Sequence, residues 1–516
     1  MTLGTTAART SGRWWAMLAS VFAVFAVTLD VTVLTVALPT LADRLAASEA
    51  QLQWFVNAYT LALVAGMLPA GLLGDRYGRK RMLVAALVLF MAGSLGCAFA
   101  PGPEAFVAAR VALGMAGAAL IVMVLSLITV LFDEAERPRA IGIWGAANFM
   151  GLPLGPIIGG WLLSHAWWGW IFVMNVPVAL VGLVFVVALI PESRAPQPPS
   201  IDIMGIVASS AGLAALMYGI VEAGDHGWGD AGAILSSIAG LSVLAFFILW
   251  ERRLTAQHGA ALVELSLFRS RSFTWGIVCT AFGVFALFGV LFSLPQYFQA
   301  VEGVDPQGSG LRLLPAVLGL IVGAVPADRV AALIGPKLTV AVGFTIVVAA
   351  ALVGATMTRT SGDGFIAGWT FVVGAGAGLG FATSASAALV ELPAERSGVG
   401  SALLQTIVKL GPAFGASILG SVLNATYQGQ VSVAGLPAAL AGAVKASVFG
   451  GVAVAGQLGS GALLAGVRDA FVAGVDDALR AGALVALVGV LVALVFLPGR
   501  VRPAEPVPSQ RAEWAR

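Results

Sequence analysis

The stretch GLLGDRYGRK, residues 71–80, decides the fold of this chain because it places a charged turn between two long apolar runs. Residues 52–73 and 82–100, which flank the turn, are almost wholly apolar. The turn carries one acidic and three basic side chains, which cannot lie in hydrocarbon. A hairpin of two membrane helices joined by a short basic cytoplasmic loop is the simplest physical interpretation.

The composition of the whole chain agrees with this interpretation. The 516 residues are 59% hydrophobic and only 10% charged, whereas a soluble domain carries about 25% charged residues. Backbone groups in lipid must be satisfied within each helix or closed barrel. The apolar runs are long and continuous, unlike the short alternating strands of a membrane barrel. We therefore predict an all-α membrane protein whose solvent is the lipid bilayer.

Length and hydropathy predict fourteen transmembrane helices. Their expected limits are 14–37, 52–73, 82–100, 105–130, 140–163, 170–190, 203–223, 231–250, 273–298, 311–332, 338–357, 365–389, 398–422 and 481–498. With a cytoplasmic N-terminus, about 20 of the 28 Lys and Arg residues fall in cytoplasmic segments. The charge pattern thus predicts an even number of spans with both termini in the cytoplasm. The first run follows Arg9 and Arg13 as a signal peptide would, but its length favours an uncleaved first helix.

A faint internal repeat divides the chain. PAGLLGDRYGRKRMLV (69–84) has an echo in GAVPADRVAALIGPKLTV (323–340), and two related halves are the usual architecture of secondary transporters. The expected parts are an N-terminal six-helix bundle (1–190), a linker with two inserted helices (191–272), a C-terminal six-helix bundle (273–500) and a cytoplasmic tail (501–516). Residues 424–480 are rich in Ala, Gly and Val, which favours a helical excursion on the outer face over a further membrane hairpin.

Charged side chains inside apolar spans are the strongest functional signal, because holding a charge there is costly. Asp30 lies well inside the first span, and a carboxylate there can take a proton or face a cation; the alternative is a helix end at the interface. Arg110 lies one to two turns inside the fourth span, where it either snorkels to the surface or pairs with Asp30. Gly114 and Gly117 behind it allow neighbouring helices to approach closely. Lys409 lies near the middle of the thirteenth span and must be paired, neutral or facing water.

The segment GLPLGPIIGG (151–160) concentrates glycine and proline within one span. Such residues loosen or kink a membrane helix. A hinge for alternating access is the functional interpretation, and close packing against a neighbouring helix is the alternative.

The sequence lacks the motifs of several functional classes of protein. There is no GxxxxGK[ST] nucleotide-binding loop, no HExxH zinc motif and no GxSxG nucleophile turn. The two cysteines, Cys97 and Cys279, lie in apolar runs and support neither a disulfide framework nor a metal site. The net charge is +2. We expect no enzyme activity, no cofactor, no metal, no nucleic-acid partner and a monomeric chain.

Taken together, these segments resemble the fourteen-helix drug:proton antiporter family of the major facilitator superfamily. The matching stretches are LDVTVLTVALP (29–39), LQWFVNAYTLALVAGMLPAGLLGDRYGRKR (52–81), RVALGMAGAA (110–119), GLPLGPIIGG (151–160), LPQYFQAVEGVDPQGSGLRLLPAVLG (294–319) and SGVGSALLQTIVKLGPAFGASILGSVL (397–423). The resemblance covers nearly the whole chain, and the order and spacing of the motifs make it specific. It implies the major facilitator fold, with two six-helix bundles and two extra central helices.

The resemblance also implies a function: export of a small hydrophobic drug or antibiotic in exchange for protons, across the bacterial cell (inner) membrane, with the proton gradient as energy source. Asp30 and Arg110 would belong to the proton-coupling machinery. Three further groups are implied: a cytoplasmic latch motif (Gly71, Asp75, Arg76, Gly78 and Arg79), an antiporter hinge motif (Gly151, Gly155, Pro156, Gly159 and Gly160), and substrate-cavity candidates (Asn57, Tyr59, Asn148, Gln296 and Lys409).

The chain departs from the family pattern at three points. Gly169 stands where family members usually carry an Arg, and Val408-Lys409 stands where an Arg followed by Gln is frequent. The later spans lack the acids that broad-range exporters of cationic drugs use, so we expect a neutral or anionic substrate, with Lys409 facing a carboxylate or phenolate. An exporter or importer of a specific metabolite is the alternative within this fold, and a membrane-embedded enzyme or channel is the distant one.

Overall fold

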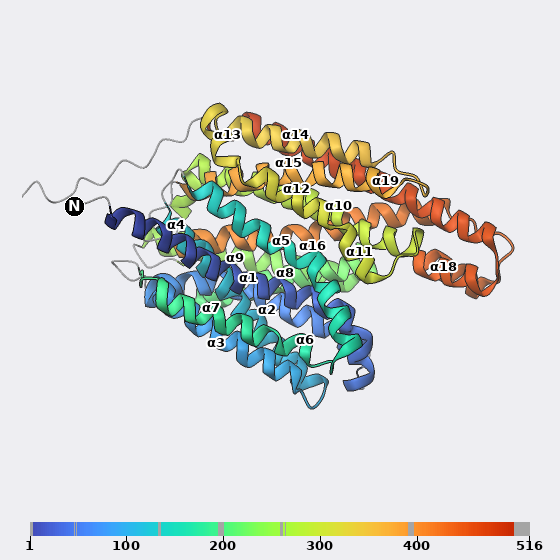
Figure 1. Ribbon diagram of the computed structural model, residues 1–516, viewed down its shortest axis with the longest axis horizontal. Helices are drawn as coiled ribbons and strands as arrows, with labels where there is room; N and C mark the ends of the chain where they lie inside the picture. The colour runs from blue at the N-terminus through green and yellow to red at the C-terminus, as the bar shows by residue number, and fades with distance from the viewer. Residues whose placement is uncertain are drawn as a thin grey trace, which may run out of the picture.

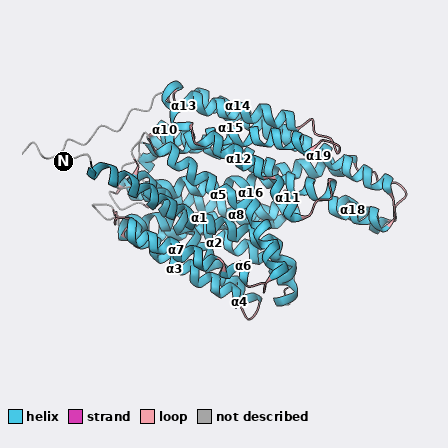
Figure 2. Ribbon diagram, viewed as in Figure 1, coloured by secondary structure: helices cyan, strands magenta, loops and turns pink. Residues whose placement is uncertain are grey.

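The computed structural model describes residues 4–45, 47, 49–132, 136–194, 201–257, 262–263, 265–390 and 397–499. Almost all of these residues are helical, and none of them forms a strand (Figure 2). The predicted tail, 501–516, and the linker residues 195–200 lie outside the described residues. The all-α class predicted from the apolar runs is confirmed.

The helices follow one another along the chain with short connections. They are α1 (Gly4–Leu45), α2 (Glu49–Tyr77), α3 (Arg79–Ala98), α4 (Pro103–Leu131), α5 (Arg137–His165), α6 (Trp170–Val173), α7 (Asn175–Leu189), α8 (Ile203–His226), α9 (Ala231–Ala256), the 3-10 helix η1 (Leu265–Arg269), α10 (Arg271–Gln296), the π-helix η2 (Tyr297–Val301), α11 (Pro306–Arg312), α12 (Leu314–Ala324), α13 (Ala327–Ile334), α14 (Pro336–Gly354), α15 (Asp363–Val390), α16 (Ser397–Gln430), α17 (Ala438–Ala446), α18 (Val448–Gln457) and α19 (Gly461–Phe496).

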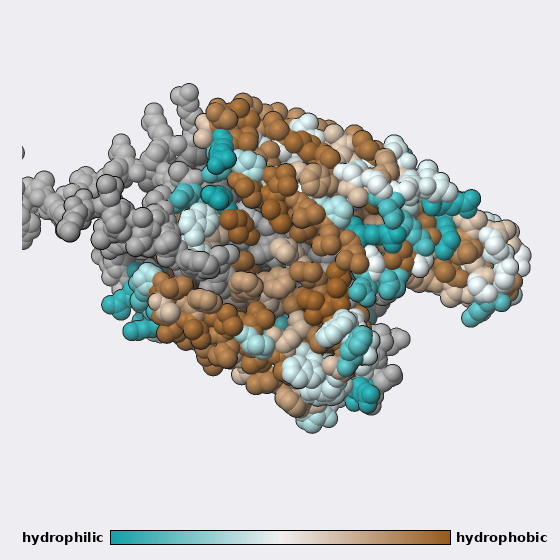
Figure 3. Space-filling model, viewed as in Figure 1, coloured by the Kyte–Doolittle hydropathy of each residue, from teal (hydrophilic) through white to brown (hydrophobic). Residues whose placement is uncertain are grey.

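Within the described part of the chain, twelve helical segments are long and apolar enough to cross a membrane. A thirteenth is obtained when Val21–Leu34 and Val36–Ala42 of α1, which meet at a bend of 50°, are counted as one span. α5 adds a helix of 29 residues, and a span needs about 20, so the structure is compatible with the fourteen predicted spans. The long helices run side by side (Figure 1), and apolar residues cover the middle of the face shown in Figure 3.

The chain forms two bundles with a helical hairpin against both. In the first, α1 packs on α5 and α7, and α2 packs on α4; in the second, α12 and α14 pack on α15, and α10 packs on α16. The inserted helices α8 and α9 pack on each other, and α8 also contacts α2 and α16. The two bundles meet through α16, which touches α2 and α4, and through α5, which touches α11, α12 and α15.

The start of α1 and the α13–α14 turn lie at one end of the bundle, on the left of Figure 1, which we call the terminal end. The chain also returns to this end after α19, because Gly499 lies beside Gly335, the residue before α14. We call the opposite end, where α18 lies, the distal end. An even number of crossings, as the basic residues predicted, is required to bring the chain back to the end where it started.

Two expected spans have different limits in the structure. The span expected at 311–332 is broken into α11, α12 and α13, because Pro315 and Pro326 each lack the backbone N–H that a helix interior needs. The last span, expected at 481–498, belongs to α19, which already begins at Gly461. The early part of α19 carries the charged residues Arg468 and Asp469. Because hydropathy detects only the apolar part of a helix, it does not reveal that this helix extends beyond the lipid.

Residues 424–480, for which we expected a helical excursion, hold the end of α16, the short helices α17 and α18, and the start of α19. α17 has 9 residues and α18 has 10, and neither can cross a hydrocarbon core about 30 Å thick. α18 lies at the distal end, beyond most of the bundle (Figure 1). This arrangement favours the excursion over a further membrane hairpin.

Candidate functional site

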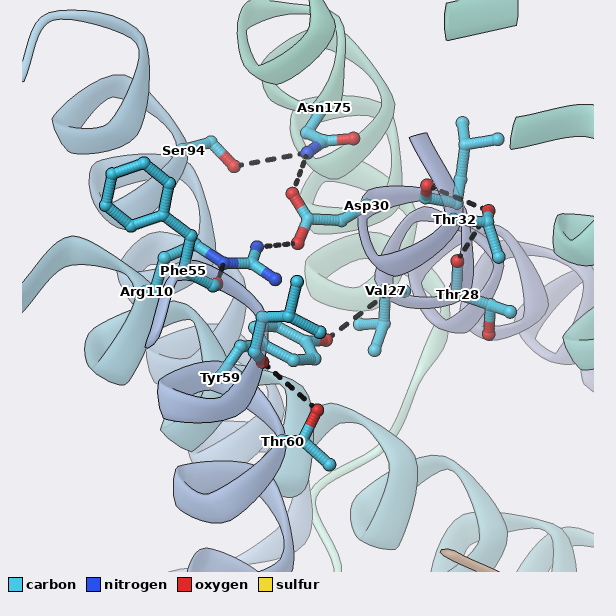
Figure 4. Close-up of polar contacts among 12 residues, drawn as sticks. Val27, Thr28, Asp30, Thr32, Phe55, Tyr59, Thr60, Ser94, Arg110 and Asn175 are labelled. Carbon is cyan, nitrogen blue, oxygen red and sulfur yellow. Dashed lines mark hydrogen bonds and ion pairs between the residues drawn. The ribbon is translucent and has the colours of Figure 1, made fainter. Parts of the chain in front are cut away.

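Asp30 of α1 and Arg110 of α4 form a buried ion pair in the first bundle (Figure 4). Asp30 is 2% exposed and Arg110 is fully buried. The guanidinium Nη1 donates to Asp30 Oδ2, and Asn175 Nδ2 donates to Asp30 Oδ1 at 3.1 Å. The carboxylate thus has one charged and one neutral donor. Of the two alternatives for Arg110, pairing with Asp30 is the one that the structure contains, and snorkelling is not.

The rest of Arg110 is held by α2. Its Nε donates to the Phe55 carbonyl oxygen at 2.9 Å, and its guanidinium lies over the Tyr59 ring at 4.3 Å, a cation–π distance. The glycines of α4 allow this approach, because a Cβ on Gly114 would lie 2.4 Å from the Tyr59 carbonyl oxygen, and one on Gly117 would lie 3.0 Å from its hydroxyl. Small residues here let α2 and α4 meet closely enough to hold the Arg.

Asn175 is a site residue that the sequence reasoning missed. It is 1% exposed, it opens α7, and besides Asp30 its amide approaches Ser94 Oγ of α3 at 3.4 Å. Its own Oδ1 has no hydrogen-bond partner. The available signal was an amide inside the sixth predicted span (170–190), in FVMNVP (172–177). With Asn175 the charged cluster draws on α1, α2, α3, α4 and α7.

The latch motif lies at the terminal end, where α2 turns into α3 across a single residue. Gly78 has φ +111°, a backbone conformation that favours glycine, and a Cβ there would lie 2.4 Å from Glu192 Oε1. Gly71 is buried within α2, and Arg76 lies 5.6 Å above the Tyr77 ring. The turn is therefore too tight for any residue other than glycine at its centre.

Asp75 connects this turn to the other bundle. Its Oδ1 accepts from Arg79 Nη2 at 2.6 Å and Nε at 3.1 Å, while its Oδ2 accepts from the Val399 backbone N–H at 3.2 Å. Val399 lies in the first turn of α16, where unpaired N–H groups and the helix dipole favour an anion. Asp75 is 1% exposed, so this bond lies in a low-dielectric contact between the two bundles.

The start of the linker completes the latch. Arg79 Nη1 donates to Ser193 Oγ at 2.8 Å, and the Arg79 backbone N–H donates to the Ser193 carbonyl oxygen at 2.8 Å. The Lys80 backbone N–H donates to Glu192 Oε1 at 3.2 Å. Glu192 and Ser193 belong to a segment that the sequence predicts only as linker, because their partners lie more than a hundred residues earlier in the chain.

The hinge motif presses α5 against α1 within one turn of Asp30. Thr32 Oγ1 donates to the Gly151 carbonyl oxygen at 2.7 Å, and a Cβ on Gly155 would lie 2.0 Å from that same Oγ1. A Cβ on Gly159 would lie 3.1 Å from Val33 Cγ1, whereas one on Gly160 would meet nothing within 4 Å. α5 is continuous through the motif, and the Pro156 side chain lies outside the described residues. Three of the four glycines therefore form the close contact.

The five substrate-cavity candidates are not gathered at one place. Tyr59 lies buried beneath Arg110 and belongs to the charged cluster. Asn57 is half-buried on α2, and Gln296 donates to the Phe292 carbonyl oxygen of its own helix at 3.4 Å. The Asn148 side chain lies outside the described residues. Lys409 is half-buried on α16.

Among the described residues, no group of three or more His, Cys, Asp or Glu could hold a metal ion, and Cys97 and Cys279 are buried free thiols.

These features define a class: a multi-pass helical membrane protein of two bundles, with a buried ion pair inside one bundle and a charged contact between the two. Residues 20–416 match the model of the Major Facilitator Superfamily, and the chain belongs to that family of membrane transporters. It is 33% identical to the tetracenomycin C resistance and export protein of Streptomyces glaucescens, over 97% of this chain and 95% of that protein. It is 32% identical to the multidrug efflux pump LfrA of Mycolicibacterium smegmatis, over 95% and 97% respectively.

Solved structures share the fold. The human organic anion transporter MFSD10 (TETRAN) superposes with a TM-score of 0.60 at 14% identity, over 93% of this chain and 99% of that one. The Escherichia coli fucose:proton symporter FucP superposes with a TM-score of 0.55 at 15% identity, over 93% and 97%. At these identities the likeness concerns the fold, and it confirms the major facilitator architecture predicted from the motifs.

We expect Asp75→Asn to slow transport several-fold and to lower stability. The amide keeps the shape of the side chain but leaves the buried Arg79 without a counter-ion, and breaking such a pair costs about 3–5 kcal/mol. The measurement is the initial transport rate in membrane vesicles together with the melting temperature of the purified protein. Arg76→Gln is the control, since Arg76 belongs to the same turn but is half-buried. A normal transport rate in Asp75→Asn would show that the Asp75 contact has no role in transport.

Proposed function

We propose that this transporter exports a small hydrophobic drug or antibiotic in exchange for protons, by alternating access as a monomer. The observation that carries the proposal is the Asp30 carboxylate, 2% exposed and paired with Arg110 inside an apolar bundle. An ionisable side chain at such a depth costs at least about 2.5–3.5 kcal/mol, so its retention indicates a function. A proton on Asp30 would remove the negative charge that holds Arg110.

The position of α1 supports coupling between this proton and the movement of the bundles. One face of α1 carries Asp30, and the nearly opposite face carries Thr32, which contacts Gly151 and Gly155 of α5. A change in the ion pair thus acts on the helix that α5 packs against.

α5 in turn reaches the second bundle near the terminal end. A Cβ on Gly142 would lie 2.9 Å from Ala324 Cβ of α12, and the Trp144 and Phe381 rings stack at 6.4 Å. These are contiguous physical contacts from Asp30 to the other bundle, and they supply a route by which protonation could bias one arrangement of the bundles over another.

The relatives support a drug or antibiotic as the exported compound. One is named for tetracenomycin C resistance and export and the other for multidrug efflux, and each aligns with nearly the whole chain. The apolar interior of the bundles suits a hydrophobic compound.

Flux into inverted membrane vesicles tests the proposal. With an acidic interior imposed, we expect a panel of hydrophobic antibiotics to contain compounds that accumulate and that release protons from the vesicles, as read by a pH-sensitive dye. Collapse of the gradient with an ionophore should stop both signals. Accumulation that persists without the gradient, or none in any compound of the panel, would contradict proton-driven export.

We further propose that the protein lies in a bacterial cell membrane with both termini in the cytoplasm. The support is the basic-residue distribution and the return of the chain to the terminal end. Green fluorescent protein fused after Arg9, or after Arg511, should fluoresce in both constructions, and alkaline phosphatase at the same points should be inactive. Active phosphatase at either position would contradict the assignment.

A further inference from the structure

α16 carries three polar side chains at four-residue spacing on an otherwise apolar stretch: Ser401, Gln405 and Lys409. Residues four apart lie above one another on a helix, so the three form one stripe. Ser401 and Gln405 are fully buried, and Lys409 is half-buried well inside the span Val399–Gln430. This stripe is separate from the charged cluster on α1 and α4.

Among the residues that the structure describes, the stripe has no hydrogen-bond or ion-pair partner. Ser401 Oγ, Gln405 Nε2 and Gln405 Oε1 are all buried without a hydrogen-bond partner. Within the described part of the chain, Lys409 takes part in no hydrogen bond or ion pair and has no acidic side chain near it. Buried polar groups are nearly always paired, so two fully buried unpaired side chains in line with an unpaired lysine indicate that something outside the chain satisfies them.

The stripe faces the other bundle. Thr406, which adjoins it, approaches Met67 Sδ of α2 at 3.9 Å. At about 100° per residue, Lys409 lies between Gln405 and Thr406 around the helix axis. The opposite side of α16 packs on α10, since a Cβ on Gly411 would lie 2.9 Å from Val284 Cγ1. Lys409 therefore points toward the contact between the bundles and not toward α10.

The chemistry of the stripe selects an anion. An ammonium group among apolar helices needs a counter-charge, and the acid deepest in the first bundle, Asp30, is already held by Arg110 and Asn175. Gln405 adds one donor group and one acceptor, and Ser401 adds a hydroxyl that can do either. Met67, which lies beside Thr406, adds an apolar surface next to the stripe for the remainder of a ligand.

We propose that Ser401, Gln405 and Lys409 form a binding stripe for exported hydrophobic acids, with Lys409 pairing with a carboxylate or phenolate of the compound. This proposal names the substrate class of the proposed exporter. That the bound acids are exported rests on the proposed function, whereas binding itself requires no proton gradient. Lys409 determines the preference for an anion, and Gln405 orients the acidic group.

The test is equilibrium binding to the full-length protein in lipid nanodiscs, with two probes of nearly equal shape: 2-naphthoate and the neutral 2-naphthamide. We expect the unmodified protein to bind the acid more tightly. Lys409→Met should weaken naphthoate binding about tenfold or more, as expected for loss of a charged hydrogen bond, and should leave naphthamide binding unchanged. Lys409→Arg should retain the preference. Lys337→Met, at the start of α14, is the control that removes a lysine elsewhere.

Lys409→Glu gives an independent result if the methionine variant does not fold. It should reverse the preference, so that 2-naphthylmethylammonium binds more tightly than 2-naphthoate. Equal binding of acid and amide by the unmodified protein, binding of neither, or retention of the acid preference in Lys409→Met overturns the proposal. 2-Naphthol at a pH above its pKa extends the comparison to a phenolate. Gradient-driven export with no acid preference would leave the proposed function standing and remove only the stripe.

Discussion

Replacing Asp30 with asparagine is expected to abolish proton-driven export while the protein still reaches the membrane. The amide fills the same space and keeps a hydrogen bond within reach of Arg110, but it cannot take up and release a proton. Flux into inverted vesicles, with and without an imposed pH gradient, measures the effect, and we expect the gradient-dependent part to fall to the level of membranes that lack the protein. Full gradient-driven transport by the variant would remove Asp30 from the mechanism.

Stability needs its own control in this experiment. Asp30→Asn leaves the buried Arg110 without a counter-ion, which costs about 3–5 kcal/mol when one partner of a buried pair is lost. The double variant Asp30→Asn with Arg110→Gln removes both charges and should recover most of the melting temperature without recovering proton-driven export. Asp30→Glu retains a titratable group and should retain part of the activity. This pattern separates a loss of coupling from a loss of folding.

The second large effect is expected from a single methyl group at Gly155. A Cβ there would lie 2.0 Å from Thr32 Oγ1 and 2.9 Å from the Thr32 backbone carbon, so Gly155→Ala must push α5 away from α1. Overpacking of this kind costs about 1–3 kcal/mol, which corresponds to roughly 5–150-fold if it falls on one step of the cycle. We expect the transport rate to fall within that range, with a smaller change in substrate affinity.

The matched control lies in the same motif. A Cβ on Gly160 would meet nothing within 4 Å, so Gly160→Ala should transport at nearly the normal rate although it removes a glycine from the same helix. Initial rates and equilibrium binding of one exported antibiotic decide between two roles. A normal rate with weakened binding in Gly155→Ala would make the segment part of a binding wall, and equal losses in both variants would point to helix flexibility instead of contact with α1.

The sequence predicted much of the charged cluster because membranes limit the choices for a charge. Asp30 and Arg110 each lie inside an apolar run, and each lacks a partner near it in the chain, so pairing them was the economical solution. It could not predict Asn175, because an amide carries no charge to mark it, and α5 and the short α6 separate it from the helix of Arg110. Tyr59 was a substrate-cavity candidate implied by the family resemblance, but its ring lies under Arg110.

The latch motif was likewise predicted only in part from the sequence. The motif between α2 and α3 can be identified in the sequence, and Asp75 was expected to belong to a cytoplasmic latch. Which helix N-terminus Asp75 contacts follows only from the packing of the two bundles, which brings Val399 within 3.2 Å of Asp75 Oδ2. Ser193 and Glu192 join Arg79 and Lys80 for the same reason.

The amino-acid sequence alone determined that the chain is helical and membrane-embedded, roughly where its spans lie, and which charged residues are costly enough to matter. These are properties of single segments in lipid, where hydrocarbon thickness and the need to satisfy each backbone group leave few alternatives. Tertiary structure alone decided how α1 meets α5, which helix Asp75 caps, and that Ser401, Gln405 and Lys409 face the other bundle without partners among the described residues. Such contacts join residues up to hundreds of positions apart, and no local pattern records them, because they arise only when two bundles close on each other.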